Sequence, residues 1–199
     1  MSGQSPDQPP PEGLILCGGR SRRLGRDKAL LPIGGRPIVA RVADALAPVA
    51  GTVRLLGRPV PGVDLPSIAD LEPFAGPLAA LGLGLPRCEA PQAFVVSCDM
   101  PFLSPGYFEL LRDRIGDADV CLPWEGDLRM PLAALYRRDV GERARDFRAQ
   151  GRNELCAFVS TLRLRAIGSR DLAAFPAGLL KNVNTPEEAR EAEILARPA

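Results

Sequence analysis

The chain has 199 residues, of which 46% are hydrophobic and 25% are charged, and its formal net charge is +1. This size fits one domain with its own core, and the small net charge excludes broad electrostatic attraction to nucleic acid or acidic membranes. Because the sequence contains no histidine, Ser-His and Cys-His nucleophiles are excluded, and catalysis must use carboxylates, amines, backbone dipoles or a hard metal ion.

The first segment of the chain, residues 1–12, carries four prolines and no apolar stretch. It predicts a disordered tail rather than a signal peptide or a membrane anchor. Residues 13–199 are then expected to form one folded domain. The five cysteines are odd in number and lack CxxC spacing, which is typical of reduced core thiols and predicts a cytoplasmic protein.

From Gly13 onwards, short apolar runs alternate with helix-like segments, as in parallel strands joined by helical crossovers. Strands are expected at 14–17, 52–56, 67–69, 93–97, 120–122, 132–136 and, at a sheet edge, 162–167. Helices are expected at 38–46, 77–85, 105–115 after an N-cap at Ser104, 139–150, and from a capping box at Thr185 to about Ala196. The fold class is therefore α/β, a single Rossmann-like domain with an open, mostly parallel sheet flanked by helices.

The stretch Gly18–Lys28 follows the first predicted strand and reads GGRSRRLGRDK. Its glycines let backbone amides approach phosphate oxygens, and its five cationic side chains neutralise a polyphosphate. The stretch matches neither GxxxxGK[ST] nor GxGxxG, so it predicts a phosphate-binding loop without indicating a P-loop ATPase or a dehydrogenase.

Asp99 comes directly after the apolar run 93–97. In open α/β sheets, ligands bind beyond the carboxyl ends of the strands, where a rigidly held carboxylate suits Mg²⁺. The position of Asp99 therefore favours a functional carboxylate over a simple cap of the turn before Pro101, and the family resemblance given next implies that it holds Mg²⁺.

Four motifs in order resemble the molybdenum cofactor guanylyltransferase family, within the nucleotidyltransferase superfamily. The first is LCGGRSRRLGRDKAL at 16–30, and the others are Asp70 with GPLA at 76–79, CDMPF at 98–102, and NVNTPE at 182–187. The resemblance spans residues 13 to about 196. It implies a Rossmann-like fold and Mg²⁺-dependent transfer of GMP from GTP to molybdopterin, with release of pyrophosphate.

The resemblance also implies roles for single residues. The nucleotide contacts would be Leu16, Cys17, Gly18, Gly19, Lys28, Asp70 and Asp99. The catalytic residues would be Lys28, Arg23 and Asp99, and the acceptor contacts Asn182 and Asn184. Asp70 taken alone is equally consistent with a turn residue. The instability of molybdopterin further implies handover of the product to a molybdoenzyme or a cofactor-delivery protein.

Three positions depart from the family pattern, namely Leu56, Ala80 and Ala133, and they leave base choice and acceptor identity open. A CTP-dependent molybdopterin cytidylyltransferase is the nearest alternative, although such relatives tend to carry alanine where this chain has Gly18 and Gly19. A sugar-phosphate nucleotidylyltransferase and a non-catalytic nucleotide-binding paralogue are the remaining alternatives.

Overall fold

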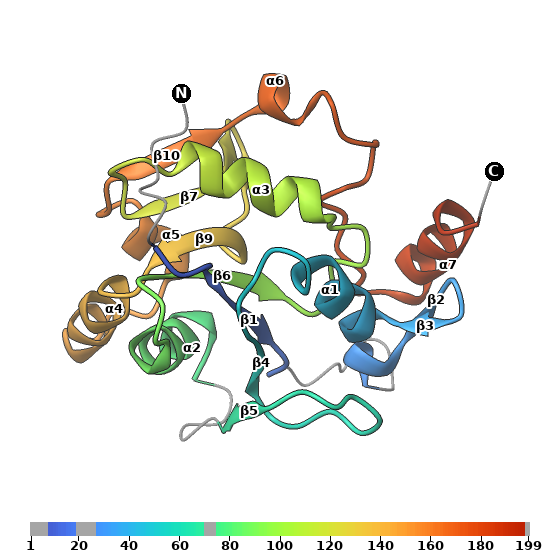
Figure 1. Cartoon of the computed structure of the whole chain (residues 1–199), viewed down its shortest axis with the longest axis horizontal. Coiled ribbons are helices and arrows are strands. Elements are labelled where there is room, and N and C mark those ends of the chain that lie inside the picture. Colours follow the sequence, from blue (N-terminus) through green and yellow to red (C-terminus); the bar gives the residue numbers. More distant parts are fainter. Residues whose placement is uncertain (1–7, 19–26, 70–74, 198–199) are drawn as a thin grey trace.

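The computed structural model describes residues 8–18, 27–69 and 75–197. Residues 1–7 of the expected tail 1–12 lie outside this part of the chain, as do Gly19, Arg23 and Asp70. In the described residues a central sheet runs through the molecule and helices pack on both of its faces (Figure 1).

The main sheet has the strand order β10-β7-β9-β6-β1-β4-β5, with β8 paired to β7. Its strands are β1 (Glu12–Leu16), β4 (Val53–Gly57), β5 (Ser67–Ala69), β6 (Gln92–Ser97), β7 (Val120–Glu125), β8 (Leu128–Arg129), β9 (Ala133–Arg137) and β10 (Leu164–Ile167). The pairs β10·β7, β6·β1, β1·β4 and β4·β5 are parallel, whereas β9 runs antiparallel to both β6 and β7. The predicted open, mostly parallel α/β sheet is confirmed.

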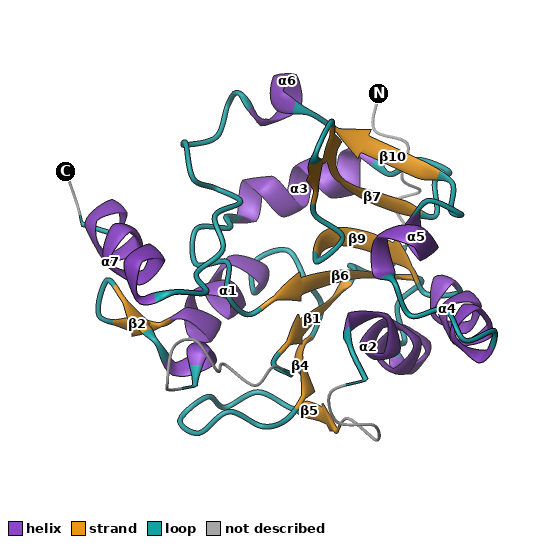
Figure 2. Cartoon of the chain, turned by 180° about the vertical axis from the view of Figure 1, so that it is seen from behind, coloured by secondary structure: helices purple, strands orange, loops and turns teal. Residues whose placement is uncertain are grey.

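The helices divide into two layers, which are visible from both sides of the molecule (Figures 1 and 2). They are α1 (Ile38–Leu46), α2 (Pro77–Gly84), α3 (Pro105–Arg114), α4 (Val140–Ala149), α5 (Leu155–Val159), α6 (Ser169–Leu172) and α7 (Pro186–Leu195), with 3₁₀ turns η1 (Lys28–Leu30) and η2 (Leu85–Arg87). One apolar cluster joins α1 and α3 to one face of the sheet, and a second joins α2, α4 and α5 to the other.

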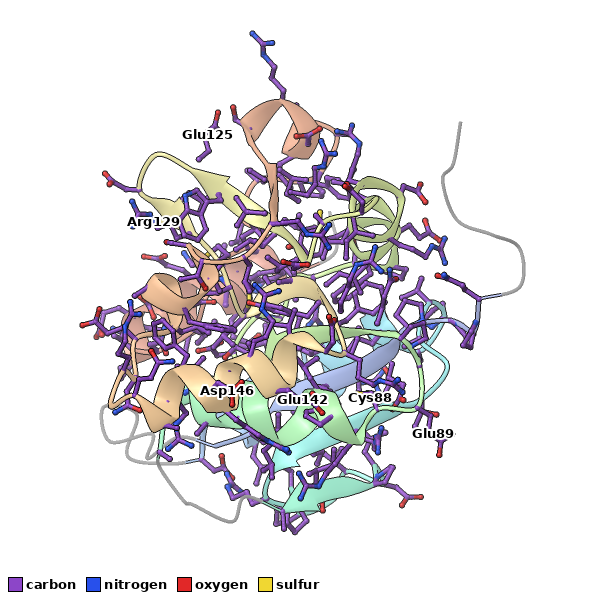
Figure 3. All side chains as sticks on the ribbon, turned by 90° about the vertical axis from the view of Figure 1, so that its left-hand side faces the viewer. Cys88, Glu89, Glu125, Arg129, Glu142 and Asp146 are labelled. Carbon is purple, nitrogen blue, oxygen red and sulfur yellow. The ribbon has the colours of Figure 1, made fainter. Side chains whose placement is uncertain are left out.

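Strand residues alternate between the two clusters. Leu14 and Val95 pack towards α2 and α4, whereas Ile15 and Phe94 pack towards α1 and α3, and all four are fully buried. Two-sided burial explains why β1 and β6 are continuous apolar runs in the sequence. The charged residues of α4 lie outside this core: in Figure 3, Glu142 and Asp146 lie on the side of α4 that faces away from the sheet.

Most predicted elements are found close to their expected positions. Helix α1 has the predicted bounds, and β10 is the expected edge strand. The capping box of α7 is formed, since the Thr185 hydroxyl accepts from the Glu188 amide and the Glu188 carboxylate accepts from the Thr185 amide. Ser104 caps α3 by position, but its side chain makes no capping hydrogen bond.

The predicted boundary between tail and domain at Gly13 is wrong, because Pro11 and Glu12 are already buried. The Pro11 carbonyl accepts from the Gly51 amide at 2.9 Å. The Glu12 carboxylate pairs with Arg54 and accepts from the backbone amide of Ala90 at 3.1 Å. These partners satisfy a carboxylate that would otherwise be costly to bury, so the folded chain includes the end of the expected tail.

The sequence analysis did not predict a two-stranded hairpin of β2 (Pro32–Ile33) and β3 (Arg36–Pro37). Its turn consists of Gly34 and Gly35, both with positive φ, which is the backbone that a two-residue hairpin turn requires. The hairpin directly follows η1 and contacts both α1 and α7. In the part of the chain that the structure describes, no helix has the length and apolar character needed to cross a membrane.

Candidate active site

The central strands β1 and β6 deliver two predicted site segments to one rim of the sheet. Leu16, the last residue of β1, is in register with Ser97, the last residue of β6. The pairing continues one residue further, since the Cys98 amide donates to the Leu16 carbonyl at 3.2 Å. Gly18 and Asp99 therefore leave the sheet side by side.

The neighbouring strand β4 ends against the same segment at Gly57. Gly57 has φ of +121°, and a Cβ atom there would lie 3.3 Å from the Gly18 nitrogen. Only glycine combines this backbone conformation with so close an approach. Gly57 thus lets β4 end directly beside Gly18, where the predicted phosphate-binding loop begins.

Lys28 begins the short turn η1, which the preceding aspartate holds in place. The Asp27 carboxylate accepts from the Ala29 amide at 3.1 Å and caps the turn, and its other oxygen pairs with the Arg58 guanidinium. Arg58 follows β4, so this ion pair ties the Lys28 turn to the sheet. The structure pairs Arg58 with Asp27 rather than directing it into the cavity described below.

The Lys28 ammonium lies between the ends of two other segments. Its Nζ is 2.6 Å from Oδ2 of Asp99 and donates to Oδ1 of Asn184 at 3.3 Å. The Lys28 side chain is 21% exposed and that of Asp99 is 6% exposed, so the ion pair faces solvent from the lysine side. Asp99 and Asn184, which lie 71 and 156 positions from Lys28 in the sequence, therefore meet around its ammonium.

Two buried oxygens at this rim have no hydrogen-bond partner. They are Oδ1 of Asp99 and Oδ1 of Asn182. The intervening loop is tied to Asp99, because the Val183 amide donates to the Asp99 carbonyl at 2.9 Å. Since buried polar atoms are nearly always satisfied in native proteins, two unpaired oxygens at one rim indicate a site for an electropositive partner.

These groups line a cavity of about 910 Å³, which is large enough for a nucleotide together with a second ligand. One wall comes from the strand ends and includes Leu16, Gly18 and Leu56. A second comes from α2, and a third from the segment before β9 and the start of α5. Lys28, Asp99 and the two asparagines lie between these walls.

Comparison with known proteins assigns the chain to a family. Residues 13–165 match the family described as the MobA-like NTP transferase domain. A probable molybdenum cofactor guanylyltransferase of Mycobacterium tuberculosis is 37% identical over 187 residues, which cover 86% of this chain and 92% of that protein. A protein of the same description from Mycobacterium marinum is 36% identical over 195 residues, covering 93% and 94%.

The chain belongs to the MobA-like NTP transferase family. Solved structures agree with its fold. A molybdopterin-guanine dinucleotide biosynthesis protein A from Archaeoglobus fulgidus superposes with a TM-score of 0.78 at 23% identity, covering 92% of this chain and 97% of that one. A 2-C-methyl-D-erythritol 4-phosphate cytidylyltransferase from Thermus thermophilus has a TM-score of 0.72 at 18% identity, covering 95% and 100%.

Most of the predicted site residues that fall within the described chain line the cavity of this MobA-like transferase. They are Leu16, Gly18, Lys28, Asp99, Asn182 and Asn184. Cys17 does not line it, because its side chain is buried in the cluster under α1 and α3. A hydrogen bond with Cys98, together with burial, raises the pKa of Cys17 well above its usual range, so this thiol stays protonated and is no nucleophile.

The wall formed by Met130, Pro131 and the start of α5 was not predicted as part of the site. Helix α5 has five residues, which is too short for a helical period to be recognised. Of the three positions that depart from the family pattern, Leu56 and Ala80 line the cavity. Ala133 is fully buried and does not line it, so it has no direct effect on the ligand.

Proposed function

We propose that this MobA-like transferase moves GMP from GTP to the phosphate of molybdopterin and releases pyrophosphate. The observation that carries the proposal is the meeting of Lys28, Asp99 and Asn184 at the rim of a large cavity. Relatives named molybdenum cofactor guanylyltransferase, similar along almost the whole chain, support the choice of substrates.

The chemistry is an in-line substitution at the α-phosphorus. An oxygen of the acceptor phosphate forms the new bond, and the bond to the β-phosphate oxygen breaks, so that pyrophosphate leaves with the electron pair. Two anions approach each other, so the site must supply positive charge along the reaction axis. Lys28 supplies an ammonium at the cavity wall. The acceptor oxygen is already ionised and needs no general base, which suits a chain without histidine.

The oxygens at the rim fit a magnesium ion. Mg²⁺ takes few protein oxygens and completes its coordination with phosphate oxygens and water. Oδ1 of Asp99 and Oδ1 of Asn182 are buried acceptors without a partner, and both residues line the cavity. We propose Asp99 as the main ligand and Asn182 as a second oxygen donor, in addition to its predicted acceptor role. Mg²⁺ supplies charge neutralisation at the triphosphate when it is bound.

Gly18 supports the choice of a purine nucleotide. Among the described residues, its chain neighbours aside, no atom would lie within 4 Å of a Cβ atom at Gly18, and Gly18 lines the cavity. The methyl group of an alanine there would therefore meet none of these described atoms and would occupy ligand space. In our proposal this space accommodates the guanine, and the apolar Leu16 and Leu56 form part of its surroundings.

The five cysteines are free thiols, which supports our further proposal that the reaction takes place in the reducing cytoplasm. Handover of the finished cofactor to a molybdoenzyme or a delivery protein also remains part of the proposal. Molybdopterin is labile, and direct transfer would protect it.

Pyrophosphate release tests the proposal. The assay offers GTP, CTP or ATP with Mg²⁺ and freshly prepared molybdopterin, and a hexose 1-phosphate replaces the pterin in a parallel series. We expect release with GTP and molybdopterin only. Gly18→Ala should lower GTP turnover more than CTP turnover. A preference of the wild type for CTP would contradict guanylyl transfer, turnover of the hexose phosphate alone would contradict the acceptor, and GTP binding without release would indicate a non-catalytic paralogue.

A further inference from the structure

Arg41 joins the two loops that carry the proposed catalytic groups. It lies on α1, and its side chain is partly buried. Its Nε donates to the Pro101 carbonyl at 3.0 Å, and its Nη1 donates to the Ile33 carbonyl at 3.3 Å. The guanidinium also lies over the ring of Phe102, 5.9 Å from the ring centroid.

Both carbonyls belong to segments that continue directly from the site. Pro101 follows Asp99 by two residues, in the turn that leaves β6. Ile33 lies in β2, immediately after the turn that begins at Lys28. The Pro101 carbonyl is therefore two residues from the carboxylate of Asp99, and the Ile33 carbonyl is five residues from the ammonium of Lys28.

Arg41 joins the two segments in a different way from the ion pair between Lys28 and Asp99. The ion pair between Lys28 and Asp99 also joins the two segments, but both of its members are proposed to contact the substrates. Arg41 binds backbone atoms and does not line the cavity. Its contacts can thus persist while Lys28 moves from Asp99 to a bound triphosphate.

We infer that Arg41 is a positioning residue for nucleotidyl transfer, which fixes the Lys28 loop against the Asp99 loop. The inference rests on the proposed function. Only arginine offers two directional N–H groups from one planar fork, with a face that stacks on an aromatic ring, so lysine would replace the charge but not the clamp. Displacement of a catalytic group by about 1 Å is enough to cost two orders of magnitude in rate.

Arg137 provides a matched control within the same chain. Its Nε donates to the Ala118 carbonyl at 2.9 Å, and its Nη2 donates to the Gly116 carbonyl at 2.7 Å. It is partly buried like Arg41, but it lies at the end of β9, beside Gln92 at the start of β6, and so at the opposite end of that strand from Asp99. Replacing either arginine removes two hydrogen bonds to backbone carbonyls. Only the carbonyls bound by Arg41 belong to the segments that carry Lys28 and Asp99.

The experiment compares Arg41→Met and Arg137→Met in melting temperature, kcat, the Mg²⁺ concentration that gives half-maximal rate, and calorimetric affinity for Mg²⁺·GTP. We expect similar losses of melting temperature. Arg41→Met should lower kcat by about tenfold to a hundredfold, raise the Mg²⁺ requirement and weaken Mg²⁺·GTP binding, whereas Arg137→Met should leave all three within about twofold.

Arg41→Lys extends the test to a variant that keeps the positive charge and disturbs folding less. We expect partial recovery of melting temperature and little recovery of the Mg²⁺ requirement. The inference is overturned if Arg41→Met and Arg41→Lys match Arg137→Met in rate, Mg²⁺ requirement and nucleotide affinity. A wild-type protein that releases no pyrophosphate from GTP would instead overturn the proposed function, and this inference with it.

Discussion

Two aspartates are buried at opposite ends of the strands, one before β7 and one after β6, and they have very different surroundings. Asp119 is 3% exposed and lies before β7, where both of its oxygens are satisfied. It accepts from Arg143 at 2.8 Å and from the side chain and backbone of Arg163 at 2.9–3.1 Å. Asp99 is 5% exposed and follows β6. One of its oxygens pairs with Lys28 and the other has no partner.

The difference separates a structural carboxylate from the carboxylate that we propose as the metal ligand. A buried charge is tolerated when hydrogen bonds satisfy it completely, as they do at Asp119. Asp99 lines the cavity and retains a buried oxygen without a hydrogen-bond partner, a desolvation cost that the proposed ligand would offset. Burial alone would not distinguish the two residues.

The largest loss of activity should follow replacement of Asp99, whose carboxylate has one oxygen without a hydrogen-bond partner. Asp99→Asn keeps the size of the side chain but removes the charge, and we expect kcat to fall by about a thousandfold through lost charge stabilisation. The melting temperature should change by only a few degrees. Steady-state kinetics with GTP and a melting curve check this, and wild-type turnover by the variant would mean that Asp99 is not the metal ligand.

Lys28→Met should rank second, with kcat/KM for GTP reduced by about a hundredfold, because one of the charges at the triphosphate is lost while the apolar stem remains. The variant also leaves Asp99 without its ammonium, so Mg²⁺ binding without nucleotide should become tighter. Kinetics and calorimetry measure both effects. Unchanged GTP affinity and unchanged turnover would argue against the proposed phosphate-binding role.

Asp119→Asn should lower the stability of the protein and leave its turnover unchanged, which is the opposite of what we expect for Asp99→Asn. We expect a loss of about 2 kcal/mol in the free energy of unfolding, since hydrogen bonds to a charged group are lost but the partner arginines are partly solvated. The turnover of the folded fraction should stay at the wild-type value. Urea unfolding and kinetics provide the comparison, and a large loss of kcat without a loss of stability would reverse the assignment.

A smaller effect of Asp119 should appear in the free energy of unfolding, which should depend on pH. Burial would raise the pKa of Asp119, but hydrogen bonds from Arg163 and Arg143 outweigh it and hold the pKa below its ordinary value. The unfolded chain therefore binds a proton first as the pH falls. The stabilisation is complete above about pH 5 and is lost progressively below about pH 4.

The difference in unfolding free energy between wild type and Asp119→Asn should accordingly shrink between pH 5 and pH 3, about the ordinary pKa of an aspartate. Urea titrations across this range measure it. A difference that stays constant with pH would show that the carboxylate of Asp119 has the same pKa in the folded and unfolded chain.

The sequence was sufficient to predict that Asp99 and Lys28 lie at the ligand rim of the sheet, and it was not sufficient to predict the surroundings of Asp119. Asp99 follows a continuous apolar run, and such a run predicts a buried parallel strand whose carboxyl end lies at the ligand rim. Lys28 ends a glycine-rich cationic stretch, which has a recognisable chemistry. Their contact follows because β1 and β6 are neighbours, an arrangement that the fold class favours.

Asp119 carries no such signal, because its partners come from α4 and the segment before β10 and meet it only in the folded chain. The same holds for Glu12, which the proline-rich context assigned to a tail. The antiparallel direction of β9 is also not encoded in an apolar run, since strand direction depends on tertiary pairing. Arg41 resembles any exposed helix arginine until its two carbonyl partners are seen.

Calorimetric titration with GTP, with and without Mg²⁺, tests the central claim most directly. The account predicts that Mg²⁺ tightens GTP binding to the wild type and to Asp119→Asn but not to Asp99→Asn. If Mg²⁺ tightened GTP binding to Asp99→Asn as much as to the wild type, the unsatisfied carboxylate at the rim would not be the metal site.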